Sequence, residues 1–483
     1  MVVLGSVVTT LDLNMTNPSL SQEIQGSLAF TPDESTWITV AYNSATLMAI
    51  ALGGWLTQSF SRRQYLIVSL LLFVGCSLAC AVAWDLTSLI TFRTVQGFIS
   101  GTFTYSAFNM VLMRLPRAKQ HLGFVMVSIT TGLPVPIGQF LAGWIDDNAG
   151  WQYIYYISAI LGLLVIAGIR RFIDPEPMHL STLKQVDWLG TFVLAIAVIS
   201  FVTMMQRGNT ENWFDSELIV GLGVVSLLLG AIFCWIELHQ PKPLIDLRLL
   251  GKLNFALANV FNLIYGFVLS YSFILPQYLG QIQRYNPVQV SSVLIWSSLV
   301  NPTVAKIIEH FETRLVLAVG TSIFLVSCFM NATLDYNVSG YQLVWSQIVR
   351  ALGQPMMGAV LSFAATENIK KEQANDATAI YNILRTIATT TANASIGTLL
   401  IKREQFHSSI VVDTVSMYNR QTLARLQQLT QFFTLQMGDP IAAQSQALNS
   451  LQQSISQQSY LMAYSDCFYF IRHLRKMVIP LAD

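Results

Sequence analysis

The chain has 483 residues, of which 27 are basic and 26 acidic, so its formal net charge at pH 7 is +1. Only 11% of the residues are charged, against about 25% in ordinary globular proteins, and 53% are hydrophobic. Because so few charges cannot cover a soluble surface, the composition predicts a polytopic membrane protein and excludes a disordered chain, a nucleic-acid-binding protein and a secreted disulfide scaffold.

Apolar runs long enough to cross a bilayer recur along almost the whole chain. A helix needs about 20 apolar residues to span the hydrocarbon core. The first run lacks the basic region of a cleavable signal peptide and is therefore counted as a span. The first and last runs are weak, and the run at 290–308 is short. We expect fourteen spans, at residues 1–20, 36–57, 64–84, 86–112, 122–145, 151–169, 187–206, 218–238, 255–279, 290–308, 315–334, 340–365, 376–401 and 460–481.

Lys and Arg are distributed unevenly between the loops that join these spans. The loops after even-numbered spans hold fourteen of them, whereas the short loops after odd-numbered spans hold two, Arg207 and Arg284. Basic residues gather in cytoplasmic loops. The bias therefore predicts that both termini are cytoplasmic and that the number of spans is even.

Asp12 lies well inside the first apolar span, and Arg93 lies well inside the fourth. An acid in a water-filled cavity between spans can bind a proton from one side and release it to the other, while a buried Arg must pair or line water. We expect Asp12 and Arg93 to couple transport to protons. The alternative for each is a structural role, as a hydrogen-bond partner of neighbouring helices.

Aromatic, amide and basic side chains within the spans are predicted to line a substrate path. These residues are Trp37, Tyr42, Asn43, Asn109, Asn259, Asn262, Tyr265, Arg350 and Arg385. The alternative is helix packing or an interfacial belt for the aromatic residues, and snorkelling to the membrane surface for the last two arginines. Because acids are scarce inside the spans, the sequence favours neutral or weakly acidic amphipathic substrates over divalent lipophilic cations.

One loop after an odd-numbered span is long and is predicted to form a helical hairpin outside the membrane. Residues 402–459 are rich in Gln, and apolar residues recur at helical spacing over 423–433. Gly438 then interrupts the pattern, with Asp439 suited to cap a second helix that begins at Pro440. The alternative is a loosely ordered polar linker. As a hairpin, the segment would offer a docking surface.

The sequence gives no sign of an enzyme, a metal site or a cofactor. None of the five cysteines forms a CxxC pair, and the six histidines lie mostly in polar loops. There is no P-loop, no GxGxxG and no cluster typical of nucleophilic catalysis. We therefore expect no catalytic residue, no metal and no cofactor.

Two pairs of short segments indicate an internal repeat. Arg63 after span 2 and Arg314 after span 10 are 251 residues apart, and Arg93 and Arg350 in spans 4 and 12 are 257 residues apart. Such repeats are typical of secondary transporters, in which one half rocks against the other around a central site. We expect an N-terminal six-helix bundle, a pair of linker helices with cytoplasmic loops, and a C-terminal bundle, at residues 1–170, 171–254 and 255–483.

Five short motifs occur in a fixed order along these spans. They are Leu11–Asn17, which contains Asp12; Arg93–Gly97, which reads R-x-x-Q-G; Asp187–Gly190; Pro243–Arg248; and Tyr381–Arg385. In this order, on fourteen spans, they resemble the major facilitator superfamily, specifically its fourteen-helix drug:proton antiporter branch of the EmrB/QacA type.

The resemblance implies an all-α major facilitator fold of two pseudo-repeated six-helix bundles with two extra helices. It implies a proton-coupled multidrug exporter of small amphipathic compounds (drugs, weak acids or siderophore-like molecules) across the inner membrane, with Arg93 at the position linked to proton coupling. Exporters that look like this work with a periplasmic adaptor and an outer-membrane channel, and the hairpin at 402–459 is then the expected dock.

The loop after span 2 departs from the family pattern. It keeps Gly54, Arg62 and Arg63 of the gating motif. The acid that helps to latch the cytoplasmic side in the family is replaced by Gln58, and the second glycine by Ser61.

Span 5 departs from the antiporter motif of the family in the same way. Gly138 and Gly143 remain, but the proline is displaced to Pro134 and Pro136, so we expect a proline bend at a shifted position.

The last span is interrupted by Arg472, His473, Arg475 and Lys476, so we expect it to insert poorly or to lie at the interface. With the altered motifs, this leaves an alternative function, that of a transport-deficient or specialised paralogue with a role in assembly or regulation.

Overall fold

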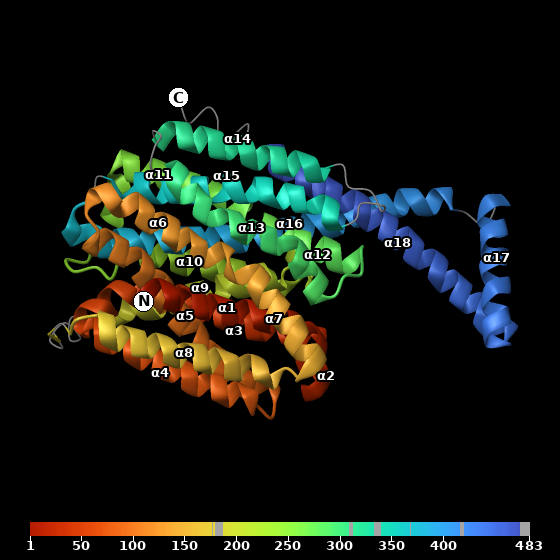
Figure 1. The fold of residues 1–483 in the computed structure, drawn as a ribbon, viewed down its shortest axis with the longest axis horizontal. Helices are drawn as coiled ribbons and strands as arrows, with labels where there is room; N and C mark the ends of the chain where they lie inside the picture. Colours follow the sequence, from red (N-terminus) through yellow and green to blue (C-terminus); the bar gives the residue numbers. More distant parts are fainter. Residues whose placement is uncertain are drawn as a thin grey trace.

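The computed structural model describes residues 1–175, 177–178, 187–308, 313–332, 340–367, 369–415 and 420–473, and all regular structure in these ranges is helical. The helices run side by side in one bundle, and two helices near the C-terminus extend beyond it (Figure 1). The predicted all-α architecture is confirmed. The end of the bundle that carries the extension is called the hairpin end below.

The first half of the bundle consists of α1 (Val2–Ser19), α3 (Pro32–Ser59), α4 (Arg62–Ala81), α5 (Leu86–Arg114), α6 (Arg117–Gly132), α7 (Pro134–Asn148) and α8 (Gln152–Phe172). A π-helical turn at Leu20–Ile24 and the short α2 (Gln25–Leu28) follow α1. The span expected at 122–145 is divided into α6 and α7, and α7 begins at Pro134, because proline lacks the amide hydrogen that a continuous helix requires.

Two helices follow the first half, α9 (Trp188–Arg207) and α10 (Glu217–His239), with a 3₁₀ turn at Trp213–Asp215 between them. The second half contains α11 (Leu253–Leu269), α12 (Tyr271–Gln281), α13 (Pro287–Ile308), α14 (Thr313–Ala332), α15 (Gly340–Thr366), α16 (Ala374–Thr414), α17 (Arg420–Met437) and α18 (Pro440–His473). Further 3₁₀ turns lie at Leu247–Gly251 and Lys371–Gln373.

The last helices are longer than the predicted spans. Helix α16 continues to Thr414, past the expected end at 401, and α18 begins at Pro440, before the expected start at 460. Hydropathy marks only the part of a helix that lies in lipid, whereas good helix formers such as Gln and Leu continue it into water. Residues 474–483 lie outside the described part of the chain, as do the side chains of Arg472 and His473.

Helix α17 and the first part of α18 pack against each other away from the bundle, whereas the last part of α18 packs against α14 and α16 within it (Figure 1). Helices α17 and α18 meet at Gly438, whose φ of 72° is a left-handed conformation that glycine adopts without strain. The next residue, Asp439, caps α18, because its Oδ1 accepts the backbone N–H of Ile441 at 2.9 Å. The Gly-Asp-Pro sequence thus produces a tight helical hairpin.

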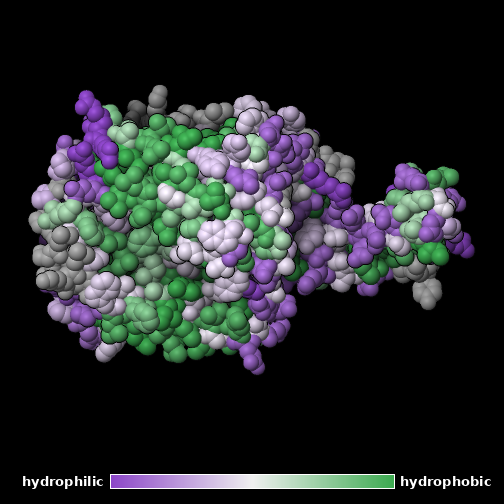
Figure 2. Space-filling model, turned by 90° about the horizontal axis from the view of Figure 1, so that it is seen from below, coloured by the Kyte–Doolittle hydropathy of each residue, from purple (hydrophilic) through white to green (hydrophobic). Residues whose placement is uncertain are grey.

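The outer surface of the bundle carries an apolar band. On the face that Figure 2 shows, hydrophobic side chains cover the middle of the bundle and hydrophilic ones gather toward its two ends. Within the described residues, eight helical segments are long and apolar enough to cross a membrane. Large exposed apolar side chains on α4, α8 and α10, among them Leu72, Leu164 and Leu227, belong to this band. Such a surface is compatible with lipid and not with water.

The two halves meet along several helices. Helices α6 and α7 pack against α13, α6 also packs against α15, and α16 packs against α3 and α5. Helix α9 lies beside both halves, because it contacts α3 of the first and α16 of the second. The junction between the halves therefore runs through the middle of the bundle, where a transported molecule would have to pass.

Candidate functional site

A buried ion pair joins α1 to α5. Asp12 Oδ2 lies 2.6 Å from Arg93 Nη1, and the side chains are 0% and 1% exposed. Removing two charges from water is costly, and their attraction repays this cost only with good geometry and further hydrogen bonds. Both residues were singled out from the sequence, and the structure brings them together.

Polar neighbours hold the guanidinium of Arg93 in place. Its Nη1 also donates to Gln96 Oε1 at 3.0 Å, and Gln96 Nε2 donates to Ser77 Oγ of α4 at 2.8 Å. The ring of Tyr42 lies 4.8 Å from the guanidinium carbon, which adds a cation–π contact. Arg93 is therefore positioned by α3 and α4, and by Gln96 of its own helix, in addition to α1.

Each member of the pair keeps one polar atom without a hydrogen bond. Asp12 Oδ1 and Arg93 Nε are buried, and neither has a hydrogen-bond partner among the residues that the structure describes. The hydrogen-bonding capacity of the carboxylate and of the guanidinium is therefore not fully used in this conformation.

Glycine allows Tyr42 to reach this pair. The backbones of α3 and α5 meet at Gly97, where an added Cβ would lie only 2.3 Å from the carbonyl oxygen of Tyr42. The hydroxyl of Thr46 donates to the carbonyl of Gly97 at 2.9 Å and fixes the contact. The glycine of the R-x-x-Q-G motif thus sets how closely the two helices approach.

A second buried arginine lies at the junction of the halves. Arg350 of α15 donates to Gln347 Oε1 at 3.0 Å, to Gln354 Oε1 at 2.8 Å and to Ser272 Oγ of α12 at 3.0 Å. The ring of Tyr271 lies 5.2 Å from its guanidinium carbon. All of these partners are neutral, which distinguishes the site from that of Arg93.

A pocket opens beside this guanidinium, between the two halves. We call it the Arg350 pocket. Its walls come from α6 and α7 of the first half and from α12, α13 and α15 of the second. The lining residues are Gly132, Val135, Pro136, Tyr271, Ser272, Leu275, Leu294, Gln347 and Arg350.

The other polar residues predicted for the path in the second half surround Tyr265. Its hydroxyl donates to the carbonyl of Gln354 at 3.1 Å, and its ring lies 5.2 Å from the guanidinium carbon of Arg385. The amides of Asn259 and Asn262 donate to backbone carbonyls, of Phe255 in the same helix and of Tyr381 in α16. Asn262 therefore joins α11 to α16, whereas the bond of Asn259 stays within α11.

The end of the bundle opposite the hairpin is closed by polar contacts between the halves. Tyr105 and Asn109 of α5 both donate to Asn375 Oδ1 of α16, at 3.2 and 2.8 Å. Arg62 is buried and donates to Asn109 Oδ1 at 3.3 Å. Gly54 lies next to this group, since an added Cβ would lie 3.3 Å from the Tyr105 hydroxyl.

The remaining residues of the predicted gating motif lie at the edge of this group. Gln58 is exposed, and Arg63 donates to the carbonyl of Arg170 at the end of α8, at 2.9 Å. Arg62 therefore makes the contact between this loop and the closed end, and not Gln58, which replaces the family acid.

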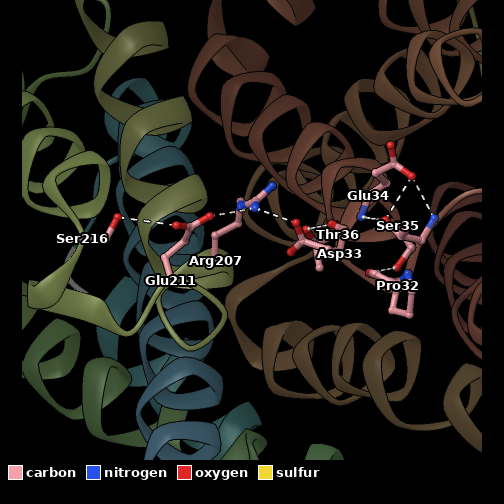
Figure 3. A network of polar contacts seen from close by, with 9 residues as sticks. Pro32, Asp33, Glu34, Ser35, Thr36, Arg207, Glu211 and Ser216 are labelled. Atoms are coloured by element: carbon pink, nitrogen blue, oxygen red, sulfur yellow. Dashed lines mark hydrogen bonds and ion pairs between the residues drawn. The ribbon is translucent and has the colours of Figure 1, made fainter.

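At the hairpin end, an ion-pair network fixes α9 to α3 (Figure 3). Arg207 Nη2 lies 2.9 Å from both Asp33 Oδ2 and Glu211 Oε1. Trp37, a residue predicted for the substrate path, lies under this guanidinium at 4.8 Å and is 39% exposed. The other predicted residue of this segment, Asn43, is half-buried on α3.

The first turn of α3 carries a capping box beside this network, also drawn in Figure 3. Thr31 Oγ1 accepts the backbone N–H of Glu34, and Glu34 Oε2 accepts the N–H of Thr31 at 2.8 Å. The hydrogen bonds from Thr31 hold the pKa of Glu34 below its ordinary value. The cap fixes where α3 begins, and with it the position of Asp33.

The residues of the altered antiporter motif place α7 between the halves. Pro134 and Pro136 are buried at the start of α7, where Pro136 also lines the Arg350 pocket. An added Cβ at Gly138 would lie 2.7 Å from Cβ of Asn14 in α1, and one at Gly143 would lie 2.9 Å from Pro287 in α13. The two glycines therefore let α7 approach one helix of each half.

Several residues of these sites were not predicted from the sequence. Gln347 and Gln354 flank Arg350 at helical spacing, and this spacing was a usable signal. Asn375 and Ser272 carry no such signal, because their partners lie far away in sequence. Among the described residues, no group of three or more potential metal ligands occurs.

The Major Facilitator Superfamily model matches residues 2–392 of the chain. The colistin resistance protein EmrB of Acinetobacter baumannii is 26% identical over 96% of this chain and 91% of its own length. The fatty acid resistance protein FarB of Neisseria gonorrhoeae is 22% identical over 99% and 93%. The proton:xylose symporter XylE has a similar fold, with a TM-score of 0.56 at 12% identity over 99% of this chain and 94% of its own.

Proposed function

The chain belongs to the major facilitator superfamily, and we propose that it is a proton-coupled secondary transporter that exports small amphipathic compounds across the inner membrane. The names of its relatives support this, since one is named for resistance to colistin and another for resistance to fatty acids, both of which are amphipathic. We infer that it crosses the membrane fourteen times.

The observation that carries the proposal is the buried pair of Asp12 and Arg93. In its charged form the pair ties α1 to α5 within the first half. When Asp12 takes up a proton, Arg93 loses its counter-ion and must be stabilised by Gln96 or by water, which changes the preferred packing of α1. Protonation thus favours one conformation over the other, and this is the requirement for coupling.

The distribution of charge supports an orientation with both termini in the cytoplasm. The basic loops after spans 2 and 6 meet at the end opposite the hairpin, where Arg63 bonds to the carbonyl of Arg170. The hairpin of α17 and α18 would then face the periplasm. The contacts of Asn375 that close the opposite end of the bundle would lie on the cytoplasmic side.

The proposed transport is tested by proton-driven uptake into inside-out membrane vesicles that contain the protein. The substrates are a lipophilic cation, a lipophilic weak acid and a siderophore, each tested with and without a proton gradient. We expect uptake against a concentration gradient for at least the weak acid, abolished by a protonophore. No uptake of any probe by folded, inserted protein would instead favour a transport-deficient paralogue with a role in assembly or regulation.

We further propose that the hairpin docks a periplasmic adaptor that leads to an outer-membrane channel. Large apolar side chains are exposed around its tip, where Leu435 is 89% and Ile441 is 82% exposed. Exposed apolar groups of this size are typical of interaction sites. Phe432 and Met437 beside them are about half exposed, so the tip offers a small apolar contact surface.

Deletion of residues 421–458 is expected to abolish co-purification of the adaptor but to leave membrane insertion intact. The double variant Leu435→Ser/Ile441→Ser should reduce co-purification about tenfold, because the apolar contact is lost. Gln444→Ser, at an exposed polar position of the same hairpin, serves as the matched control. Undiminished co-purification with the deletion would reject this dock.

A further inference from the structure

The two repeat-related arginines of the bundle differ in their partners. Arg93 of α5 is paired with Asp12 of α1, the helix that packs against it. Arg350 of α15 instead meets Ser272 of α12, at 3.0 Å. The corresponding segment of the second half, residues 253–281, contains no Asp or Glu at all. The second half therefore has a buried arginine, Arg350, but no acidic residue that matches Asp12.

Neutral groups alone surround Arg350 in the described part of the chain. Its hydrogen bonds go to two glutamine side chains and one serine, and no carboxylate lies within ion-pair distance of it among those residues. The side chain is only 8% exposed. A buried cation without an anion is costly unless water or a ligand supplies the missing charge.

A second guanidinium in the same region also lacks a counter-ion. Arg385 is 9% exposed, and its Nη2 is buried without a hydrogen-bond partner among the described residues. Tyr265 links the two arginines. Arg385 covers its ring, and its hydroxyl bonds to Gln354, which is also a partner of Arg350. Two cations therefore make this region electropositive.

The Arg350 pocket combines this charge with an apolar wall. Gln347 and Ser272 line it on the polar side, while Val135 of α7 and Leu275 and Leu294 of the second half form the apolar side. An arginine guanidinium pairs strongly with the oxygens of an anionic group such as a carboxylate. The free space beside Arg350 is only about 20 Å³ in this conformation, so the halves must move apart before a molecule with one carboxylate and an apolar body can enter between these walls.

We propose that Arg350 binds the carboxylate of an amphipathic monoanion in this pocket and that Gln347 and Ser272 position its guanidinium. The inference rests on the proposed function, because it makes the pocket part of the transport path and names the substrate class. Because the pocket is lined from both halves, a bound anion would contact the two parts that must move against each other.

The test measures equilibrium binding of radiolabelled laurate to the purified full-length protein in detergent, with no proton gradient. Dodecanol and dodecyltrimethylammonium, which have the same chain and a neutral or cationic head, are the competitors. We expect both to compete at least tenfold less well than unlabelled laurate. Arg350→Gln should weaken laurate binding roughly tenfold to a hundredfold, and Arg350→Lys should weaken it less. Arg425→Gln, which removes an exposed charge from α17, should leave binding unchanged.

A second variant separates loss of binding from loss of folding. Ser272→Asp places a carboxylate beside Arg350 and so rebuilds in the second half the pair that the first half has. It neutralises the buried charge, so the variant should be at least as stable as the wild type, yet it should bind laurate as weakly as Arg350→Gln. Unchanged laurate binding in a folded Ser272→Asp or Arg350→Gln protein would overturn the proposal.

Failure of this inference is distinguishable from failure of the proposed function. If proton-driven uptake occurs but laurate does not bind, or binds independently of Arg350, the proposed anion site is wrong and the proposed export function stands. If laurate binds through Arg350 but no probe is transported in vesicles, the anion site stands and the exporter is wrong.

Discussion

Replacing Asp12 alone or Arg93 alone is expected to destabilise the protein strongly, whereas replacing both is expected to restore most of the stability. Asp12→Asn leaves the guanidinium of Arg93 without a counter-ion, and Arg93→Gln leaves a buried carboxylate. Removing one partner of a buried pair costs about 3–5 kcal/mol, because the other charge stays uncompensated. Thermal unfolding in detergent of the two single variants and the double variant Asp12→Asn/Arg93→Gln measures this.

The same three proteins separate the structural role of the pair from its role in transport. The double variant should fold and insert like the wild type but should not drive uptake against a gradient, because no titratable group remains at the site. If the double variant transported normally, the pair would be a structural anchor of α1 and α5. Equal stability of all three variants and the wild type would show that the pair contributes nothing to the fold.

Gly97→Ala is expected to damage both packing and activity. An added methyl group would lie 2.3 Å from the carbonyl oxygen of Tyr42, so α3 and α5 would have to move apart, and with them the ring that covers Arg93. Overpacking of this kind costs roughly 1–3 kcal/mol or more. We expect a clear drop in melting temperature together with loss of proton-driven uptake.

Gly75→Ala in α4 is the matched control for this substitution. No atom lies within 4 Å of a Cβ added there. Because alanine favours helix over glycine by roughly 0.5–1 kcal/mol, this change should leave stability equal or slightly higher. Equal effects at the two positions would contradict the close approach of α3 and α5.

The sequence was sufficient to predict the class of the fold and the residues of the ion pair. Low charge and repeated apolar runs indicate membrane helices, and a charge inside such a run must find a partner. That Asp12 and Arg93 are each other's partner could not be predicted, because they are 81 residues apart. Such a contact depends on how α1 packs against α5.

Side chains at helix ends were harder to place than those near helix centres. The contact of Trp37 with Arg207 was not predicted, nor was the ion pair of Arg207 with Asp33, which lies one helical turn before Trp37. Arg350 and Arg385 fitted either a cavity or the membrane surface by sequence, and both are buried. Burial of a long basic side chain depends on neighbouring helices, which one sequence pattern does not contain.

The extent of α16 and α18 could not be predicted from hydropathy. The break at Gly438 is encoded locally, by a glycine, a capping acid and a proline in succession. The continuation of α16 and α18 is not, because it depends on how α18 packs against α16 and α17.

The most direct test of the account compares two modes of transport in vesicles that contain the wild type or Asp12→Asn. One mode is uptake driven by a proton gradient, and the other is exchange of labelled for unlabelled substrate at equal pH on both sides. If Asp12 is the proton-coupling group, Asp12→Asn should reduce the rate of gradient-driven uptake at least about a hundredfold, because the titrating group is gone. The same variant should keep exchange. Gradient-driven uptake that survives in Asp12→Asn would contradict the account.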